Sequence, residues 1–106
     1  MSLAHNVFFT LQDKSPTAVQ KLVDDCQKYL TIQPGMIYFA CGKVEPELDR
    51  DVNVRDWDVG LHIIFKDRAA HDAYQEDASH EHFIEENKAN WAKVRVIDSL
   101  VNGKIM

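Results

Sequence analysis

Apolar and polar residues alternate at the start of the chain, and this period of two predicts a strand over residues 4–12. Successive side chains of a strand point to opposite faces, so the segment divides into two sets. One face carries His5, Val7, Phe9 and Leu11, and the other carries Asn6, Phe8 and Thr10. The first set is apolar apart from its histidine, which is therefore either a hydrogen-bonded core residue or part of a pocket.

The pattern changes to helical spacing over residues 15–30. Ser15 suits the N-cap and Pro16 the first helical position. An apolar stripe recurs at every third or fourth residue and comprises Val19, Leu22, Val23, Cys26, Tyr29 and Leu30. Pro34 and Gly35 form a turn signal, so the helix is expected to end before them.

Three more strands and two shorter helices are predicted further along the chain. The strands are expected at residues 35–44, 57–66 and 93–101, with a charged, irregular loop at residues 45–56. Asp67 is expected to cap a short helix over residues 68–75. A second helical piece is expected from about Ser79, with one side formed by His80, Phe83, Ile84, Asn87 and Trp91.

The predicted order β-α-β-β-α-β over residues 4–101 is typical of one α+β domain with the ferredoxin-like fold, in which helices cover one face of a four-stranded antiparallel sheet. The other face is expected to be apolar as well, because it would carry Phe8, Ile37, Phe39, Ile64, Ile97 and Val101. A bare apolar face of this size indicates an interaction site. We therefore expect a homodimer in which two sheets pack face to face, a dimeric α+β barrel.

Composition narrows the class of protein. Seventeen acidic and twelve basic residues give a formal net charge of −5, and the scattered basic residues argue against nucleic-acid binding. No apolar run reaches the roughly 20 residues of a membrane span, and no signal peptide is recognisable. Cys26 and Cys41 are expected to be reduced core thiols. We expect a cytoplasmic protein with no membrane partner.

Several motifs, taken in order, resemble the stress-responsive A/B barrel domain family, often called Dabb. The resemblance covers residues 4–101 and rests on the following features: the opening AHNVFFTL around His5, Gly35 and Gly42 around the second strand, the strand from Asp58 to Phe65, the pattern Tyr74-x5-His80-x2-Phe83, and Asp98 in the last strand. The usual family form carries His-Pro where this chain has Asp77-Ala78, but Tyr74, His80 and Phe83 stay in register.

This resemblance implies a homodimer with a small-molecule pocket between sheet and helices. One branch of the family looks like a polyketide cyclase that catalyses an intramolecular aldol condensation without a cofactor, and its reactive residues fall at Tyr74 and His80. The ligand-binding set is expected to be His5, Val7, Val59 and Phe83. A further pocket histidine of that branch would fall near Val59, where this chain has none. His62 is predicted on the opposite strand face, where a structural role is expected.

The chemistry of the side chains also favours Tyr74 and His80 as the reactive pair. His80 lies in the first turn of a predicted helix, whose positive end disfavours a charged imidazole, and a neutral imidazole can accept a proton. Tyr74 could stabilise a developing enolate by hydrogen bonding. The pair suits proton abstraction next to a carbonyl in a phenolic or polyketide-like ligand. The alternative is that His80 only caps and packs, while Tyr74 closes the core.

The remaining polar candidates are expected to be structural. His71 and His82 are predicted to be solvated helix-face residues. His80 and His82 are two positions apart and so point in different directions on a helix, which makes them a poor chelate; we expect no metal and no cofactor. Asp98 needs a partner if it is buried, and Arg95 or a helix-end amide are the candidates.

Three functions therefore stay open at this point. The first is a small-molecule pocket that catalyses a cyclase-like or isomerase-like reaction, and it requires a cavity of a few hundred Å³ lined by His5, Tyr74 and His80. The second is a non-catalytic, stress-related binding or structural protein. The third is a monooxygenase-like dimeric barrel, which rests on analogy of fold alone.

Overall fold

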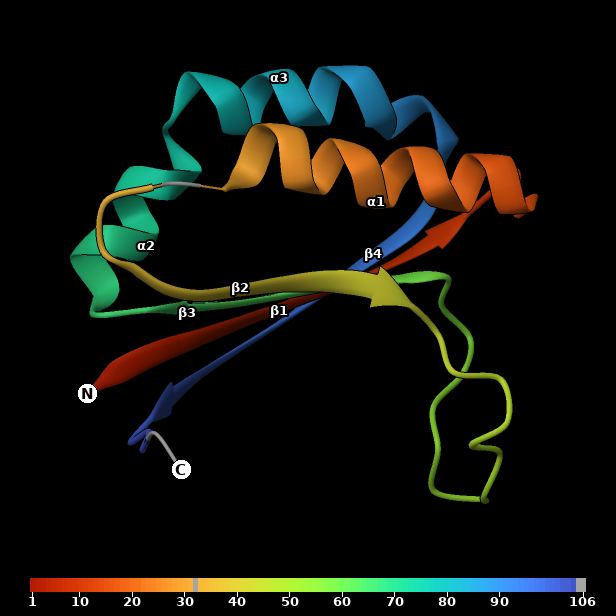
Figure 1. Cartoon of the computed structure of the whole chain (residues 1–106), viewed down its shortest axis with the longest axis horizontal. Coiled ribbons are helices and arrows are strands. Elements are labelled where there is room, and N and C mark those ends of the chain that lie inside the picture. The colour runs from red at the N-terminus through yellow and green to blue at the C-terminus, as the bar shows by residue number, and fades with distance from the viewer. Residues whose placement is uncertain (32, 105–106) are drawn as a thin grey trace.

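The computed structural model describes residues 1–31 and 33–104 and has the predicted order of elements (Figure 1). The strands are β1 (Ser2–Leu11), β2 (Met36–Lys43), β3 (Val59–Phe65) and β4 (Trp91–Val101). The helices are α1 (Pro16–Leu30), α2 (Arg68–Gln75) and α3 (Ala78–Asn87), and a 3₁₀ turn, η1 (Lys88–Asn90), leads into β4. Each strand lies within two residues of its predicted ends.

The four strands form one antiparallel sheet in the order β2-β3-β1-β4. Figure 1 shows α1 and α3 side by side over one face of this sheet, with α2 at one end of the same layer. The predicted ferredoxin-like fold is therefore confirmed. In the part of the chain that the structure describes, no helix covers the other face of the sheet (Figure 1).

Each helix begins at a polar side chain that accepts a backbone N–H, as the sequence predicts for the first two. The Ser15 hydroxyl accepts the N–H three residues on at 3.2 Å, and the Asp67 carboxylate does the same at 2.9 Å. For α3 the cap is Asp77, whose carboxylate accepts the N–H of Ser79 at 2.8 Å. Helix α3 thus starts at Ala78, just before the expected Ser79, and its cap fixes where His80 lies.

The core lies between the sheet and the helices. The odd-numbered residues of β1 and β3 face this layer, and most are fully buried: Val7, Phe9, Leu11, Val59, Leu61, Ile63 and Phe65. The predicted stripe of α1 packs against them through Leu22, Cys26 and Leu30. The prediction that Trp91 continues α3 is wrong, because the chain turns at η1 and Trp91 begins β4. Its ring packs against Phe9 with centroids 4.9 Å apart.

The uncovered face of the sheet is apolar, as predicted, but one of the residues predicted on it lies elsewhere. Ile37 and Ile97 are 59% and 57% exposed, as expected for a bare apolar face. Phe39, however, pairs with the buried Ile63 and packs into the core, so its prediction on the uncovered face is wrong. The register of β2 against β3 shifts between Met36 and Tyr38, and this bulge reverses the alternation that the sequence alone suggests.

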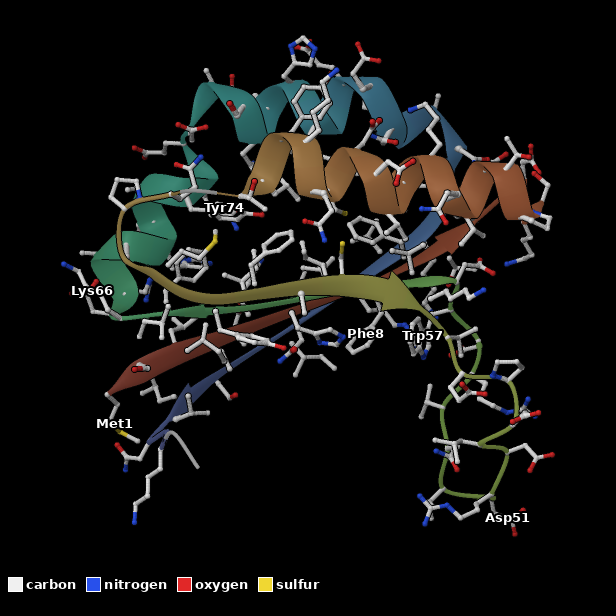
Figure 2. The ribbon with its side chains drawn as sticks, viewed as in Figure 1. Met1, Phe8, Asp51, Trp57, Lys66 and Tyr74 are labelled. Atoms are coloured by element: carbon white, nitrogen blue, oxygen red, sulfur yellow. The ribbon has the colours of Figure 1, made fainter. Side chains whose placement is uncertain are left out.

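Residues 44–58 form the long loop between β2 and β3, which extends away from the helices (Figure 1). Trp57 at its end packs on Phe8 of the uncovered face, with ring centroids 5.0 Å apart (Figure 2). Asp58 anchors the loop by accepting hydrogen bonds from the Leu11 N–H and the Lys14 ammonium, both at 2.8 Å. Among the described residues, the helices are all too short or too polar to cross a membrane.

Candidate active site

A cavity of about 190 Å³ lies between the sheet and the helices α2 and α3. Its floor comes from β1 and β3, its roof from the helices, and one side from the edge strand β4. The lining residues are His5, Val7, Phe9, Leu30, Leu61, Tyr74, Gln75, His80, Phe83, Ile84, Trp91, Val94 and Val96. Most of these are apolar, and the ionisable side chains among them are His5, Tyr74 and His80.

His80 reaches the cavity from the first turn of α3. Its Nδ1 atom is buried and has no hydrogen-bond partner among the described residues. Burial lowers the pKa of His80, and the nearby His5 lowers it further, while the acidic Asp77 and Glu81 oppose the shift. The imidazole is therefore neutral near pH 7 and can accept a proton. A buried polar atom without a partner is uncommon in folded proteins and marks a place where a ligand or water would bind.

Tyr74 meets His80 from the last turn of α2, and Figure 2 places its side chain between the helices and the sheet. The two rings are 4.7 Å apart, edge to face. Packing against Phe65, at 5.1 Å, holds the phenol ring in place. Burial raises the pKa of Tyr74 above its ordinary value, so its hydroxyl stays protonated and can donate a hydrogen bond.

His5 lies in the middle of β1, and its ring is 6.0 Å from that of Tyr74. Its Nδ1 faces Asp98 Oδ1 at 2.6 Å across the β1–β4 pair. A carboxylate at this distance favours the tautomer with hydrogen on Nδ1, which leaves Nε2 as the basic nitrogen. Burial lowers the pKa of His5, and the hydrogen bond with Asp98 opposes that effect. The partner of Asp98 is thus His5, which is neither of the two candidates from the sequence, Arg95 or a helix-end amide; Arg95 instead binds Asp56.

The structure brings together five of the six predicted site residues: His5, Val7, Tyr74, His80 and Phe83. Val59 does not line the cavity, because its side chain is fully buried in the core opposite Phe9. Sequence reasoning missed the contribution of β4, whose Val94 and Val96 form the cavity edge. Asp98 was the only residue of this strand on which the resemblance rested, so no signal pointed to the two valines.

Of the three other histidines, two lie where they were predicted and one does not. His82 is exposed as expected. His71, predicted to be solvated, has a side chain only 15% exposed, and its ring is 5.1 Å from that of His5. The prediction failed because α2 is tilted so that this face packs on Phe65 of the sheet. His62 lies on the uncovered face, as predicted, and its Nδ1 is 2.8 Å from Asn6 Oδ1.

The sheet with helices on one face places the chain in the class of small α+β proteins with the ferredoxin-like fold. Within that class, the model of the stress responsive A/B barrel domain, Dabb, matches residues 3–101, so the chain belongs to this family. The resemblance read from the sequence motifs is confirmed. Among curated proteins, none matches the chain in sequence.

Solved structures confirm the fold. A Dabb family protein from Mesorhizobium loti is 24% identical with a TM-score of 0.76, over 96% of this chain and 98% of that chain. A dimeric ferredoxin-like protein of unknown function from Thermobifida fusca is 17% identical with a TM-score of 0.78, over 95% and 92% of the two chains. The hydroxynitrile lyase of Passiflora edulis is 16% identical with a TM-score of 0.76, over 99% and 97%.

Proposed function

We propose that this protein is a small-molecule enzyme whose side chains alone abstract a proton next to a carbonyl group, as in a polyketide-cyclase-like condensation. The observation that carries the proposal is the side chain of His80, which lines an apolar cavity and whose buried Nδ1 has no hydrogen-bond partner among the described residues; its ring is 4.7 Å from that of Tyr74. The structural likeness to a hydroxynitrile lyase is consistent with a lyase-type or condensation reaction on this fold.

The roles of the three polar groups follow from their protonation. Neutral His80 acts as the general base, since burial keeps it from carrying a proton at rest. Protonated Tyr74 donates to the carbonyl oxygen and stabilises the enolate that forms. His5, oriented by Asp98, binds the polar end of the substrate through Nε2. None of these steps needs an organic cofactor.

The size of the cavity limits the substrate class. A protein cavity of about 150 Å³ is enough to hold benzene, and this one measures about 190 Å³. The fitting substrates are therefore phenolic or polyketide-like compounds of about one ring. Larger compounds would have to extend past Val94 and Val96, where the cavity borders exposed side chains of β4.

The proposal includes a homodimer formed by the uncovered faces of two sheets. Apolar side chains on that face, including Ile37, Tyr38 and Ile97, are more than half exposed in the single chain. Contiguous apolar surface of this kind indicates a protein contact. The similar protein from Thermobifida fusca is described as dimeric. In this arrangement the cavities lie on the far side of each sheet from the partner.

Deuterium exchange tests the proton abstraction directly. A monocyclic aryl methyl ketone in D₂O, whose spontaneous exchange is slow, should exchange its α-hydrogens faster with the protein present. Removing the base with His80→Gln should reduce the enzymatic rate by at least about 100-fold. Removing the donor with Tyr74→Phe should reduce it by about 100-fold. The matched control is Tyr38→Phe, a change of the same kind at a tyrosine that is 59% exposed.

A wild-type protein that does not accelerate exchange, or a His80→Gln variant as fast as wild type, would overturn the catalytic proposal. Imidazole NMR of His5 and His80 with the same ketone then distinguishes a non-catalytic binding protein from a protein without a ligand pocket. Shifts of both signals without exchange would support a non-catalytic binding protein. The absence of any shift would argue against a ligand pocket for this class of compound.

A further inference from the structure

A second cluster of polar side chains lies beside the cavity and shares only His5 with the cavity lining. His5, His71 and Asp98 come from β1, α2 and β4, and each offers one ligand atom within 4.8 Å of the other two. The three side chains range from buried to exposed: His5 is 4% exposed as a residue, His71 has 15% of its side chain exposed, and Asp98 has 44%. The cluster is thus anchored inside the protein and open to solvent at its carboxylate.

The histidine from α2 is already oriented by a second carboxylate. His71 Nδ1 lies 2.9 Å from Asp72 Oδ1, which leaves Nε2 as the free nitrogen. Asp72 is held in turn by the Arg68 guanidinium at 2.8 Å. A carboxylate behind a histidine fixes the tautomer and raises the basicity of the other nitrogen, an arrangement that commonly supports metal-binding histidines.

The three ligand atoms are close enough for a small divalent ion to draw them together. Bonds of about 2.1 Å in tetrahedral geometry place ligand atoms roughly 3.4 Å apart. For the ion to bind His5 Nδ1, the hydrogen on that atom must move to Nε2. The distance from Nδ1 to Asp98 Oδ1, 2.6 Å, must then lengthen by less than 1 Å, and the half-exposed carboxylate is free to make that movement. Two imidazoles and one carboxylate favour Zn²⁺, Co²⁺, Ni²⁺ or Fe²⁺ over Mg²⁺ and Ca²⁺, which prefer oxygen ligands.

We propose that His5, His71 and Asp98 form a binding site for one divalent transition-metal ion, Zn²⁺ in the first instance. Three protein ligands leave a fourth position for water or for an oxygen atom of a ligand. Because His5 also lines the cavity, that position borders the cavity wall next to Tyr74. The site shares His5 with the proposed catalytic site but leaves His80 and Tyr74 unoccupied, and His71 and Asp98 lie outside the cavity lining.

Cobalt titration of the full chain, stripped with EDTA and desalted, tests the site without any organic compound. Wild-type protein should take up one Co²⁺ per chain and show the visible absorption band of a four- or five-coordinate Co²⁺ ion. Zn²⁺ should displace the Co²⁺. His71→Ala and Asp98→Asn should each weaken binding by at least about 10-fold. The matched control is His82→Ala, because His82 is exposed and lies 3.5 Å from Glu86, the other histidine–carboxylate pair that could attract the ion.

The proposal fails if wild type shows no saturable uptake, if His71→Ala and Asp98→Asn both bind as wild type does, or if His82→Ala abolishes binding. Strong near-ultraviolet bands from cobalt–thiolate bonds would assign the ion to Cys41 and would also overturn it. Should His71→Ala disturb packing around Phe65, Asp98→Asn decides, since it changes a half-exposed side chain. Ketone exchange measured in EDTA tests the proton abstraction by His80 and Tyr74 without any bound metal, so the two proposals fail or succeed separately.

Discussion

His5 and His80 approach the same cavity by different routes, one from the middle of a strand and the other from the first turn of a helix. Both are kept neutral by burial, yet only His5 has a carboxylate partner. The apolar walls exclude the solvent that would otherwise stabilise an imidazolium. The two imidazoles can therefore have different roles in the proposed reaction. His80, which has no hydrogen-bond partner on Nδ1 among the described residues, is free to accept the substrate proton, whereas His5 is held by Asp98.

These histidines also make stability depend on pH. Burial lowers the pKa of His5, His62 and His80 below the value of 6.5 expected in the unfolded chain. Below that value the unfolded state binds more protons than the folded state, so the free energy of unfolding should fall as pH decreases from about 6.5 towards the folded pKa values. The loss is at most about 1.4 kcal/mol per pH unit for each histidine.

Urea unfolding at fixed protein concentration, at about pH 7.5 and about pH 5.5, measures this effect. His80→Gln should make the pH dependence shallower, whereas His82→Gln, on the exposed side of the same helix, should leave it unchanged. An equally steep dependence in His80→Gln would mean that the imidazole is not kept neutral by the cavity.

Contacts between side chains that are far apart in the sequence were the hardest part of the site to predict. Asp98 was expected to need a partner only if buried; it is half-exposed, and its partner lies 93 positions away and is set by the register of β1 against β4. His71 has the polar neighbours of a surface residue, and only the tilt of α2 against Phe65 buries it. Tyr74 and His80 were found because a motif, rather than a contact, pointed to them.

At the scale of elements, the turn before β2 controls how α2 fits against the sheet. Gly35 has φ +82°, a left-handed conformation in which side chains are strained. A Cβ there would lie 2.5 Å from Ala70 Cβ of α2, closer than two carbon atoms can approach. The Lys66 N–H also bonds to the Gly35 carbonyl at 2.8 Å, which joins the turn to the segment before α2.

Gly35→Ala should therefore destabilise the protein by about 1–3 kcal/mol, and more if α2 has to move. Chemical denaturation measures the change, and Gly103→Ala serves as the control because nothing lies within 4 Å of a Cβ at that position. If α2 shifts, the Tyr74 and His80 rings separate and ketone exchange slows as well. Equal stability of the two variants would show that the turn has room to relax.

Element order and most boundaries followed from the sequence because caps and periodicity are local signals. Ser15, Pro16 and Asp67 act where they were expected to. The error at Phe39 has a local cause that composition does not reveal: one extra residue between Met36 and Tyr38 exchanges the two faces of the strand. The error at Trp91 arose because an apolar residue after α3 fits helical spacing and strand spacing equally well.

At the scale of the whole molecule, the sheet separates two surfaces with different tasks. One face carries the core and the cavity, and the other carries exposed apolar residues with the loop of residues 44–58 at its end (Figure 1). A helix layer on only one side leaves the sheet half covered. In the proposed homodimer, the partner supplies the missing layer, so that association completes the core rather than the site.

A charge on the uncovered face should prevent this association. Ile97→Glu places a carboxylate where burial against the partner would leave it unpaired, and the dimer dissociation constant should rise by at least about 100-fold. Sedimentation equilibrium measures it. Val52→Glu is the matched control, since Val52 lies in the loop and is 76% exposed. A dimer that tolerates Ile97→Glu, or a wild-type monomer, would rule out pairing through this face.

The edge strand β4 gives the cavity one wall that is unlike the others. Val94 and Val96 line the cavity while remaining 40% and 52% exposed, whereas Phe9, Leu61 and Phe83 on the other walls are almost fully buried. Substitutions in the buried walls disrupt the core, but the two valines contribute little buried area to folding. In the proposed enzyme, these two positions can therefore change the shape of the cavity without a large cost in stability, and the pair is the natural starting point for directed evolution.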